Sequence, residues 1–370
     1  MLQKKICIIY NFAQHYRTSI FRLLDRTFEC SFYFGASYLD IKKMDYNLLA
    51  GDVHEVPTIK ISHFKYRKGI LGLLRKKYDA YIILGESRVV STWLFLLLSR
   101  LYPQKKVYSW THGWTGKEKG IIKILDKIFL KLPNGGNFLY GNYARNLIIE
   151  EGLDPQKQFV VHNSLAYEEQ LEMRKRLKQL PIYTEHFGND YPNLMFIGRL
   201  TRIKKLDQTL RAMSHLKDKG QLYNITFIGG GETQEELQKL ATKLGLEKNV
   251  WFYGPCYDES ELSGLIYNAD LCVSPGNVGL TAMHTMVFGT PVLTHDDFPH
   301  QMPEFEAIHA GETGAFFKID DVESLAEGIS KWFFEKGDKR EEVRRACMNE
   351  IDENWTPYFQ IKVFKKVLCQ

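Results

Sequence analysis

Cysteine is scarce in this sequence, and the six that occur form no metal-binding pattern. They are spread over 370 residues, and none stands in a Cys-x-x-Cys pair. Cys7 and Cys272 lie within apolar runs, where a buried thiol is the expected state. These observations speak against a disulfide framework and a zinc site, and they favour a reducing compartment.

Long hydrophobic runs are also missing. The longest apolar stretch, near residues 93–98, is bounded by Ser and Thr before it and by Ser and Arg after it. It falls short of the roughly 20 apolar residues that a transmembrane helix needs, and we interpret it as a buried helix. The first ten residues are too short and too polar for a signal peptide. We expect a cytoplasmic protein that is free or peripheral at the inner face of the cytoplasmic membrane.

The two halves of the chain carry charge of opposite sign. Residues 1–180 contain 29 Lys and Arg against 16 Asp and Glu, a net charge of +13, whereas residues 181–370 have a net charge of −8. A basic half favours an anionic partner, such as a membrane surface, a phosphorylated acceptor or nucleic acid. No nucleic-acid-binding motif occurs in it, so we expect no nucleic-acid partner.

Short β-rich runs alternate with helical patterns along the chain, which predicts two parallel sheets covered on both faces. The predicted fold is α/β, with two doubly wound, Rossmann-like domains facing across a cleft. We assign the first domain to residues 1–170, a linker to 171–191, the second domain to 192–354 and an amphipathic helix to 355–370. The predicted strands are 5–11, 30–35, 55–61, 80–85, 106–112, 138–141, 159–163, 194–199, 224–229, 250–254, 271–275, 291–295 and 314–319.

Residues 274–292, SPGNVGLTAMHTMVFGTPV, contain the most informative motif of the chain. An apolar strand ends at a Pro-Gly turn, and a loop of small residues leads into a short helix. Gly276 and Gly279 have no side chain, so the backbone N–H groups around Leu280 and Thr281 can approach a phosphate. Upstream, Gly198-Arg199-Leu200 ends another predicted strand, and Lys204 lies five residues after Arg199.

These motifs, in this order, resemble the donor-binding half of family 4 (group 1) glycosyltransferases of the GT-B fold. The resemblance implies a UDP- or GDP-linked sugar donor and no required metal. It implies that Arg199 and Lys204 hold the diphosphate, where fixed cations stabilise the charge that develops as the sugar–phosphate bond breaks. It further implies donor contacts for Gly198, Gly230, Gly276, Gly279, Leu280 and Thr281, and a place beside the base for Tyr257.

The sequence departs from that family at its Glu-x7-Glu motif, where the corresponding residues are Gly276 and His284. The second Glu of the family usually binds the ribose hydroxyls, and His284 offers a single donor or acceptor there instead of a bidentate carboxylate. The first Glu usually contacts the transferred sugar, and Asn277 is the first alternative for that contact. Downstream, Glu304 keeps the Pro-Glu dipeptide of the family, whereas Glu306 keeps its distance to a later glycine, so both remain candidates.

Polar residues 295–306 include two His and two Asp, but no Asp-x-Asp occurs in the chain and the spacing is not that of a zinc site. We expect no metal. In the first half, His112 within Trp-Thr-His-Gly-Trp resembles the family's His-Gly element, whose His lies near the transferred sugar. His15 and Arg17 follow the first predicted strand, and we interpret them as acceptor contacts.

A lysine recurs every four residues in the segment after His112, at Lys119, Lys123, Lys127 and Lys131. Apolar residues fill the opposite arc of the predicted helix. Two interpretations remain open. Either this is an ordinary surface helix with its apolar face on the core, or its lysines face an anionic membrane leaflet.

The predicted function is a retaining glycosyltransferase that moves a sugar from a nucleotide-diphosphate sugar to a glycan acceptor. The acceptor is expected to be linked to a lipid through polyprenyl diphosphate at an anionic membrane surface, in bacterial capsule or lipopolysaccharide synthesis. Two alternatives remain: a GT-B-fold sugar-nucleotide epimerase, and a non-catalytic partner protein that keeps the fold.

Overall fold

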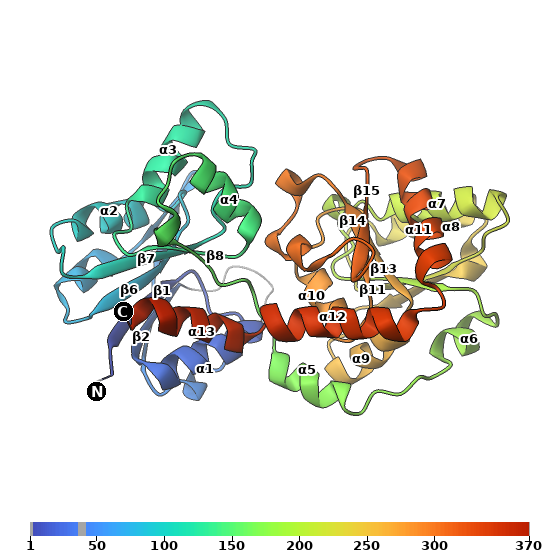
Figure 1. Cartoon of the computed structure of the whole chain (residues 1–370), viewed down its shortest axis with the longest axis horizontal. Coiled ribbons are helices and arrows are strands. Elements are labelled where there is room, and N and C mark those ends of the chain that lie inside the picture. The colour runs from blue at the N-terminus through green and yellow to red at the C-terminus, as the bar shows by residue number, and fades with distance from the viewer. Residues whose placement is uncertain (1–2, 36–41, 370) are drawn as a thin grey trace. The chain divides into compact units, whose positions relative to one another are not determined.

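The chain folds into two compact units, which are described separately (Figure 1). Unit 1 consists of residues 1–167 and 356–370, and unit 2 of residues 168–355. This computed structural model describes residues 3–35 and 42–369.

The segment 171–191, expected as a linker, is partly helical. It contains the end of α5 (Tyr167–Arg174) and all of α6 (Ile182–Phe187), and it lies in unit 2. The C-terminal helix α13 (Pro357–Leu368) lies in unit 1, where its apolar side chains join the core under α1 (Thr18–Thr27).

Unit 1 is built on a sheet of seven parallel strands in the order β3-β2-β1-β6-β7-β8-β9. The strand order reverses between β1 and β6, and ligands of such sheets bind at the carboxyl ends of the strands near this point. The strands are β1 (Lys5–Tyr10), β2 (Glu29–Gly35), β3 (Asp52–Val56), β6 (Ala80–Leu84), β7 (Lys106–Thr111), β8 (Gly136–Leu139) and β9 (Gln158–Val160).

Helices cover both faces of this sheet. The core on one face includes apolar residues of α1 and α13. The core on the other face includes residues of η3 (Ile70–Arg75), α2 (Val90–Ser99) and α3 (Gly120–Lys131). Helix α4 (Asn142–Glu150) packs in a smaller cluster with β8 and α3. The short 3-10 helices are η1 (His15–Arg17), η2 (Tyr46–Leu48) and η4 (Pro155–Lys157).

An antiparallel hairpin, β4 (Thr58–Ile61) and β5 (Phe64–Arg67), was not predicted. The single strand expected over 55–61 is divided between β3 and β4. The hairpin is attached to the loop after β6, because the Lys65 N–H donates to the Arg88 carbonyl at 3.0 Å. The buried Arg67 guanidinium pairs with Glu86 at 2.5 Å.

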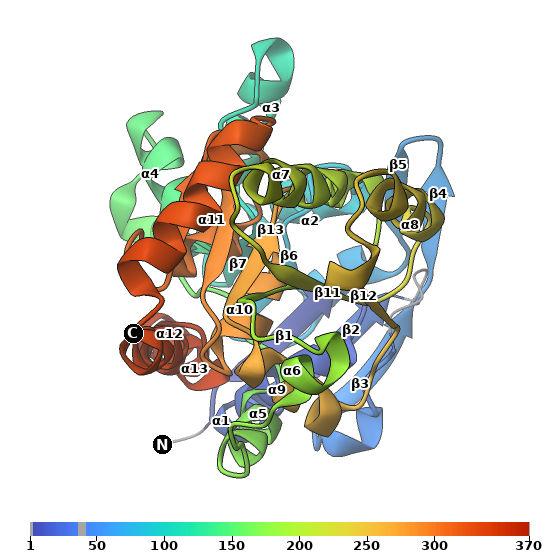
Figure 2. The same cartoon turned by 90° about the vertical axis from the view of Figure 1, so that its right-hand side faces the viewer.

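Unit 2 is built on six parallel strands in the order β12-β11-β10-β13-β14-β15, which reverses between β10 and β13. Figure 2 shows α7, α8 and α11 on one side of this sheet and α9, α10 and α12 on the other. The strands are β10 (Asn193–Ile197), β11 (Asn224–Ile228), β12 (Val250–Gly254), β13 (Leu271–Ser274), β14 (Val292–His295) and β15 (Gly314–Phe317). The α-helices are α7 (Asp207–Asp218), α8 (Gln234–Lys243), α9 (Glu259–Asn268), α10 (Leu280–Met286), α11 (Val322–Lys336) and α12 (Arg340–Asn354). The 3-10 helices are η5 (Arg202–Lys204), η6 (Glu247–Asn249), η7 (Phe298–His300) and η8 (Pro303–Ala307).

The predicted α/β class with two parallel sheets is confirmed. Apart from the 55–61 segment, the ends of the predicted strands differ from the observed ones by no more than three residues. Near-continuous apolar runs make such strands easy to recognise, because parallel strands are buried on both faces.

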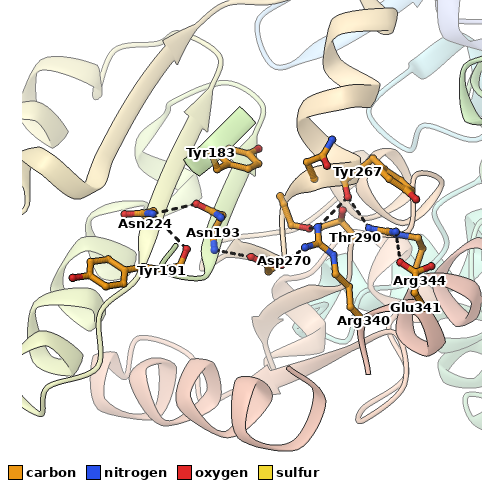
Figure 3. A network of polar contacts seen from close by, with 12 residues as sticks. Tyr183, Tyr191, Asn193, Asn224, Tyr267, Asp270, Thr290, Arg340, Glu341 and Arg344 are labelled. Carbon is orange, nitrogen blue, oxygen red and sulfur yellow. Dashed lines mark hydrogen bonds and ion pairs between the residues drawn. The ribbon is translucent and has the colours of Figure 1, made fainter. Parts of the chain in front are cut away.

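A polar network closes the amino-terminal edge of the second sheet (Figure 3). The Asp270 carboxylate accepts from the Asn193 N–H at 2.8 Å and pairs with Arg340 at 2.6 Å. Arg344 lies over the Tyr267 ring, with 3.6 Å from its guanidinium carbon to the ring centroid. These residues therefore attach α12 to the sheet at the edge opposite to the carboxyl ends of its strands.

The charge difference between the halves is larger between the structural units. Unit 1 carries 28 Lys and Arg against 13 Asp and Glu, a net charge of +15, and unit 2 has a net charge of −10. Among the helices of the described residues, none is both long and apolar enough to cross a membrane.

Candidate functional site

The strand ends at the reversal point of the second sheet bring two of the predicted motifs together. Gly198 and the exposed Arg199 follow β10, and Gly276 follows β13, its neighbour in the sheet. The Gly276 N–H donates to the Lys204 carbonyl at 3.0 Å. A Cβ at position 276 would overlap the Ile203 carbonyl and lie 2.7 Å from the Lys204 Cα. Glycine is therefore required here, and a glutamate would not fit without moving the 203–204 backbone.

Lys204 is the cation at the centre of this site. Its ammonium group donates to the Asn277 carbonyl at 2.6 Å and to the Asn277 side-chain oxygen at 2.9 Å. Burial lowers the pKa of Lys204 to about 8, a shift that negative charge at Glu304 opposes and Arg199 reinforces. Asn277, the predicted substitute for the missing first Glu, thus holds Lys204 in place.

Glu304 lies on η8 and is 2% exposed. Its charge acts on Lys204, whereas Glu306, two residues later, is more exposed. Phe298 and Phe305 stack in parallel at 4.5 Å and fix η7 against η8. Glu304 therefore contributes to the electrostatics of this site, and a donor contact for either Glu304 or Glu306 stays a prediction.

Side chains hold the loop between β13 and α10 in place. The Thr281 hydroxyl on the first turn of α10 donates to the Ile197 carbonyl at the end of β10, at 2.9 Å. The Val278 N–H donates to the side chain of Gln301 at 2.8 Å. Gly279 precedes α10 with a φ of 53°, and Leu280 begins the helix. Sequence reasoning missed Gln301. Because its side chain accepts from the Val278 N–H, that N–H group is used within the loop.

The glycine turn after β11 packs against the end of β10. A Cβ at Gly231 would overlap the Leu200 carbonyl, and the Leu200 N–H donates to the Gly230 carbonyl at 3.0 Å. Close backbone approach therefore explains this turn without a ligand, and a donor contact for Gly230 stays a prediction. Tyr257 is 93% exposed, and its expected place beside a base also stays a prediction.

His284, which stands in place of the second Glu, contacts a carboxylate from another helix. Its Nε2 lies 3.0 Å from Oε1 of Glu259, in the first turn of α9. The same oxygen accepts from the Gln170 side chain at 3.2 Å. The His284 and Glu259 side chains are 20% and 31% exposed. Sequence reasoning missed Glu259, because nothing in the sequence relates a residue on α9 to one on α10.

The polar segment after β14 forms local contacts. The His300 Nδ1 lies 2.7 Å from an Asp297 carboxylate oxygen, and the Asp297 N–H donates to His295 at 3.2 Å. Across residues 3–35 and 42–369, no group of three or more His, Cys, Asp or Glu is placed to hold a metal ion.

In unit 1, His112 follows β7 and lies against Tyr140, with ring centroids 4.6 Å apart. The side chain is exposed to solvent. Partial desolvation by the surrounding protein and the positive charge of Arg17 both lower the pKa of His112, to about 4, so it is neutral at physiological pH.

Arg17 is 6% exposed and lies among four aromatic rings. Its guanidinium carbon is 5.4–5.9 Å from the ring centroids of Tyr10, Tyr16, Trp110 and Tyr140. His15 is exposed, and its Nδ1 lies 3.2 Å from the Lys42 carbonyl. Arg17 therefore acts on the charge state of His112, and acceptor contacts for His15 and Arg17 stay predictions.

A cavity of about 550 Å³ opens in unit 1 beside His112. Its walls come from the carboxyl ends of β6 and β7, the β4–β5 hairpin and α3. Lys60 and Lys65 of the hairpin and Arg88 of the loop after β6 line it. Sequence reasoning missed this wall, although alternating apolar and basic residues on either side of Ser62-His63 are typical of a hairpin.

The prediction for the lysine-rich helix α3 needs correction. Lys123 and Lys127 both pair with Glu151 on the adjoining α4 segment, and Lys119 and Lys131 are exposed. The apolar arc does not lie on the core. The helix α2, expected to be buried, likewise exposes one face. The exposed apolar side chains of α2, its C-terminal flank and α3 are Val90, Leu94, Leu97, Leu98, Leu101, Ile121, Ile122, Ile124, Leu125 and Ile128.

These two helices are neighbours. The rings of Trp93 on α2 and Phe129 on α3 have centroids 4.9 Å apart, and Arg100 donates to the Lys131 carbonyl at 2.8 Å. The interpretation in which α3 packs its apolar face on the core is therefore wrong, because Phe129 and Leu130 are the only buried residues of α3.

The whole chain resembles solved glycosyltransferases in fold. A lipopolysaccharide outer core galactosyltransferase, WaaB, superposes with a TM-score of 0.72 at 16% identity, covering 99% of both chains. Anabaena Alr3699/HepE in complex with UDP superposes with a TM-score of 0.71 at 14% identity, covering 99% of this chain and 100% of that one. The structure therefore has the GT-B fold.

The sequence comparison concerns unit 2. Residues 182–349 match the family model of group 1 glycosyl transferases. The chain is 32% identical over 170 residues to the D-inositol 3-phosphate glycosyltransferase of Corynebacterium jeikeium, a match that spans 43% of this chain and 38% of that relative. The match to the group 1 glycosyl transferase model thus lies within unit 2, and the site at the ends of β10 and β13 is formed by matched residues.

Proposed function

We propose that this protein is a retaining glycosyltransferase that uses a nucleoside-diphosphate sugar. The observation that carries the proposal is the meeting of Arg199, Lys204 and the 276–281 loop at the reversal point of the second sheet. Parallel sheets bind ligands at this point, and two cations there suit a diphosphate. HepE, which shares the fold, is described in complex with UDP.

Arg199 and Lys204 hold the diphosphate of the donor and stabilise the negative charge that it gains as the bond to the sugar breaks. The acceptor hydroxyl attacks from the face that the leaving group vacates, and its proton passes to the leaving phosphate. The pKa of Lys204 is lowered, and a bound diphosphate should raise it again, because a nearby anion favours the charged form of a lysine. Neutral His112 in unit 1 serves as a hydrogen-bonding group toward the transferred sugar.

His284 and Glu259 together bind the ribose of the donor in this proposal. Within the family that the sequence resembles, a glutamate at position 284 would accept from the ribose hydroxyls. Here Oε1 of the Glu259 carboxylate lies 3.0 Å from Nε2 of His284. A carboxylate has about four lone-pair positions, so Glu259 can accept a hydroxyl as well as its protein donors.

The acceptor is a glycan linked to a lipid, carried by a polyprenyl diphosphate at the inner face of the cytoplasmic membrane. Two features of unit 1 support this proposal: its net charge of +15, and the exposed apolar residues of α2 and α3. A basic surface with apolar side chains is typical of peripheral binding to anionic lipid. Synthesis of capsule or lipopolysaccharide fits this acceptor, and WaaB is named for lipopolysaccharide outer core synthesis.

The proposal is tested by binding and turnover of UDP-, GDP- and ADP-sugars. We expect one of these donors to raise the melting temperature and to be consumed when a glycan acceptor is present. Consumption of the donor without any acceptor, giving an isomeric sugar nucleotide, would instead show an epimerase. Failure to bind any of the three at millimolar concentration would leave a non-catalytic protein that keeps the fold.

A further inference from the structure

We propose that the cavity of unit 1 binds the phosphate-bearing head of an amphiphilic acceptor, whose apolar chain lies along the exposed face of α3. This inference rests on the proposed function, since it names the acceptor site of the same reaction. It uses three features of unit 1 that sequence reasoning did not combine: the β4–β5 hairpin, the loop after β6 and the apolar arc of α3.

The cavity has the size and position of a ligand site. Its volume of about 550 Å³ lies in the range usual for small-ligand pockets. Gly85 and Thr111, at the carboxyl ends of β6 and β7, form its floor, and His112 and Trp114 belong to its wall. A ligand held there contacts His112 directly, the same residue that the proposed mechanism assigns to the sugar.

Cations outnumber anions around this cavity. Lys60, Lys65 and Arg88 line it, against Glu86 and Asp126. Arg67 of the hairpin compensates Glu86 through the ion pair at 2.5 Å. Burial raises the pKa of Asp126, although the nearby Arg88 and a hydrogen bond from Ser87 oppose this shift. The surplus of positive charge selects an anionic head, and clustered cations suit a phosphate or diphosphate.

Apolar side chains continue from the cavity along α3. Asp126, Phe129 and Leu130 form the α3 wall of the cavity. Ile122 and Leu125, 62% and 46% exposed, precede Asp126 and Phe129 by four residues and so adjoin them on the helix surface. A free phosphate would not contact this apolar face, and a bilayer surface alone would not fill the cavity. An amphiphile with a phosphate head would contact both.

Calorimetry with three probes on the full chain tests the two halves of the site separately. The diphosphate site proposed in unit 2 would also bind these probes, so each titration, including those of the variants below, is made both on the wild-type background and on Arg199→Ala with Lys204→Ala. In the latter background, inorganic diphosphate reports the basic cavity, farnesol reports the apolar face, and farnesyl diphosphate below its aggregation concentration reports both. There we expect farnesyl diphosphate to bind about tenfold or more tightly than inorganic diphosphate. Equal affinity for these two probes would overturn the role of α3.

Paired variants assign each part. Lys60→Ala with Lys65→Ala should weaken both diphosphate probes by about 10- to 100-fold, because hydrogen bonds to charged groups are lost. Ile122→Ser with Leu125→Ser should weaken farnesyl diphosphate alone by about tenfold. The control pair Lys117→Ala with Lys119→Ala removes two cations outside the cavity wall, and we expect a change of no more than about twofold. Thermal unfolding of each variant checks that unit 1 remains folded.

The opposing results are distinct. Equal losses in the control pair and the Lys60/Lys65 pair would show that only the net charge of unit 1 attracts anions, which overturns the site. Binding of phosphatidylglycerol vesicles without binding of farnesyl diphosphate would make α3 a bilayer contact, which also overturns it. Binding of a nucleotide sugar to unit 2, measured on the same samples, tests the proposed function independently of these results.

Discussion

The two units share one architecture but differ in net charge and in exposed apolar surface. Both are doubly wound parallel sheets, with the strand order reversed after the first three strands. Unit 1 has a net charge of +15 and exposes apolar side chains on two helices, whereas unit 2 has a net charge of −10. The sequence match to group 1 glycosyl transferases lies in unit 2.

This difference matches the proposed reaction, in which unit 2 binds the donor and unit 1 binds the acceptor. The donor of the proposed reaction carries a diphosphate, and the residues assigned to it lie in the part of the chain that matches the family model. The acceptor varies in chemistry, and the wall that we assign to it consists of a hairpin and a helix face without a shared motif. Predictions that separate the two units therefore test the comparison directly, and they follow in order of expected effect.

The largest effect should come from the cations of unit 2. Arg199→Ala and Lys204→Ala should each lower the rate of sugar transfer by about 10²–10³-fold, because each removes a group that stabilises the departing diphosphate. The measurement is the turnover of donor with a glycan acceptor. Arg202→Ala is the control, since this exposed residue pairs with Glu236 and should leave the rate within about twofold. Near-normal transfer in the Arg199 and Lys204 variants would remove the proposed diphosphate site.

Restoring the family's first glutamate should harm unit 2 instead of improving it. Gly276→Glu forces a side chain against the backbone of Ile203 and Lys204, so we expect a loss of about 1–3 kcal/mol in the free energy of unfolding. Chemical denaturation measures it. Gly72→Glu in unit 1 is the control, because nothing lies within 4 Å of a Cβ at that position. An unchanged midpoint for Gly276→Glu would contradict the close approach of the two loops.

Loss of the Glu259 charge should have a smaller effect, limited to ligands that carry ribose hydroxyls. Glu259→Gln should weaken binding of the preferred nucleoside diphosphate by about tenfold, while binding of its 2′,3′-dideoxy analogue stays unchanged. Glu261→Gln is the matched control on the same turn of α9, where its side chain contacts Tyr253. Equal losses for the two nucleotides would mean that Glu259 only supports the fold of α9 and α10.

The last expected effect, a dependence on pH, is of similar size. Because the pKa of Lys204 is lowered to about 8, its ammonium loses a proton as pH rises from 7 to 9. Nucleotide affinity should fall by about tenfold over this range if the cation holds the diphosphate. In Lys204→Arg the guanidinium stays charged, and the fall should disappear. A fall of equal size in that variant would assign the titration to another group.

Much of the fold was predictable because its strands are buried on both faces and therefore read as apolar runs. The positions of Arg199 and Gly276 were predictable for the same reason, since each follows such a run. The partner of His284 was not, because α9 and α10 are joined only by packing. The exposed arc of α3 was not predictable either, and the sequence left two interpretations of that helix open: an amphipathic pattern shows that a helix has two faces, but not which one the core covers.

The sequence by itself determined the α/β class, the motif order of unit 2 and the opposite charges of the two halves, because these follow from local periodicity and composition. Only the tertiary structure decided why position 276 must be glycine, that Glu304 acts on Lys204, and that Glu259 contacts His284. It also decided that the apolar arc of α3 faces outward beside a basic cavity. These outcomes depend on contacts between segments far apart in the chain, and local sequence patterns carry no information about such contacts.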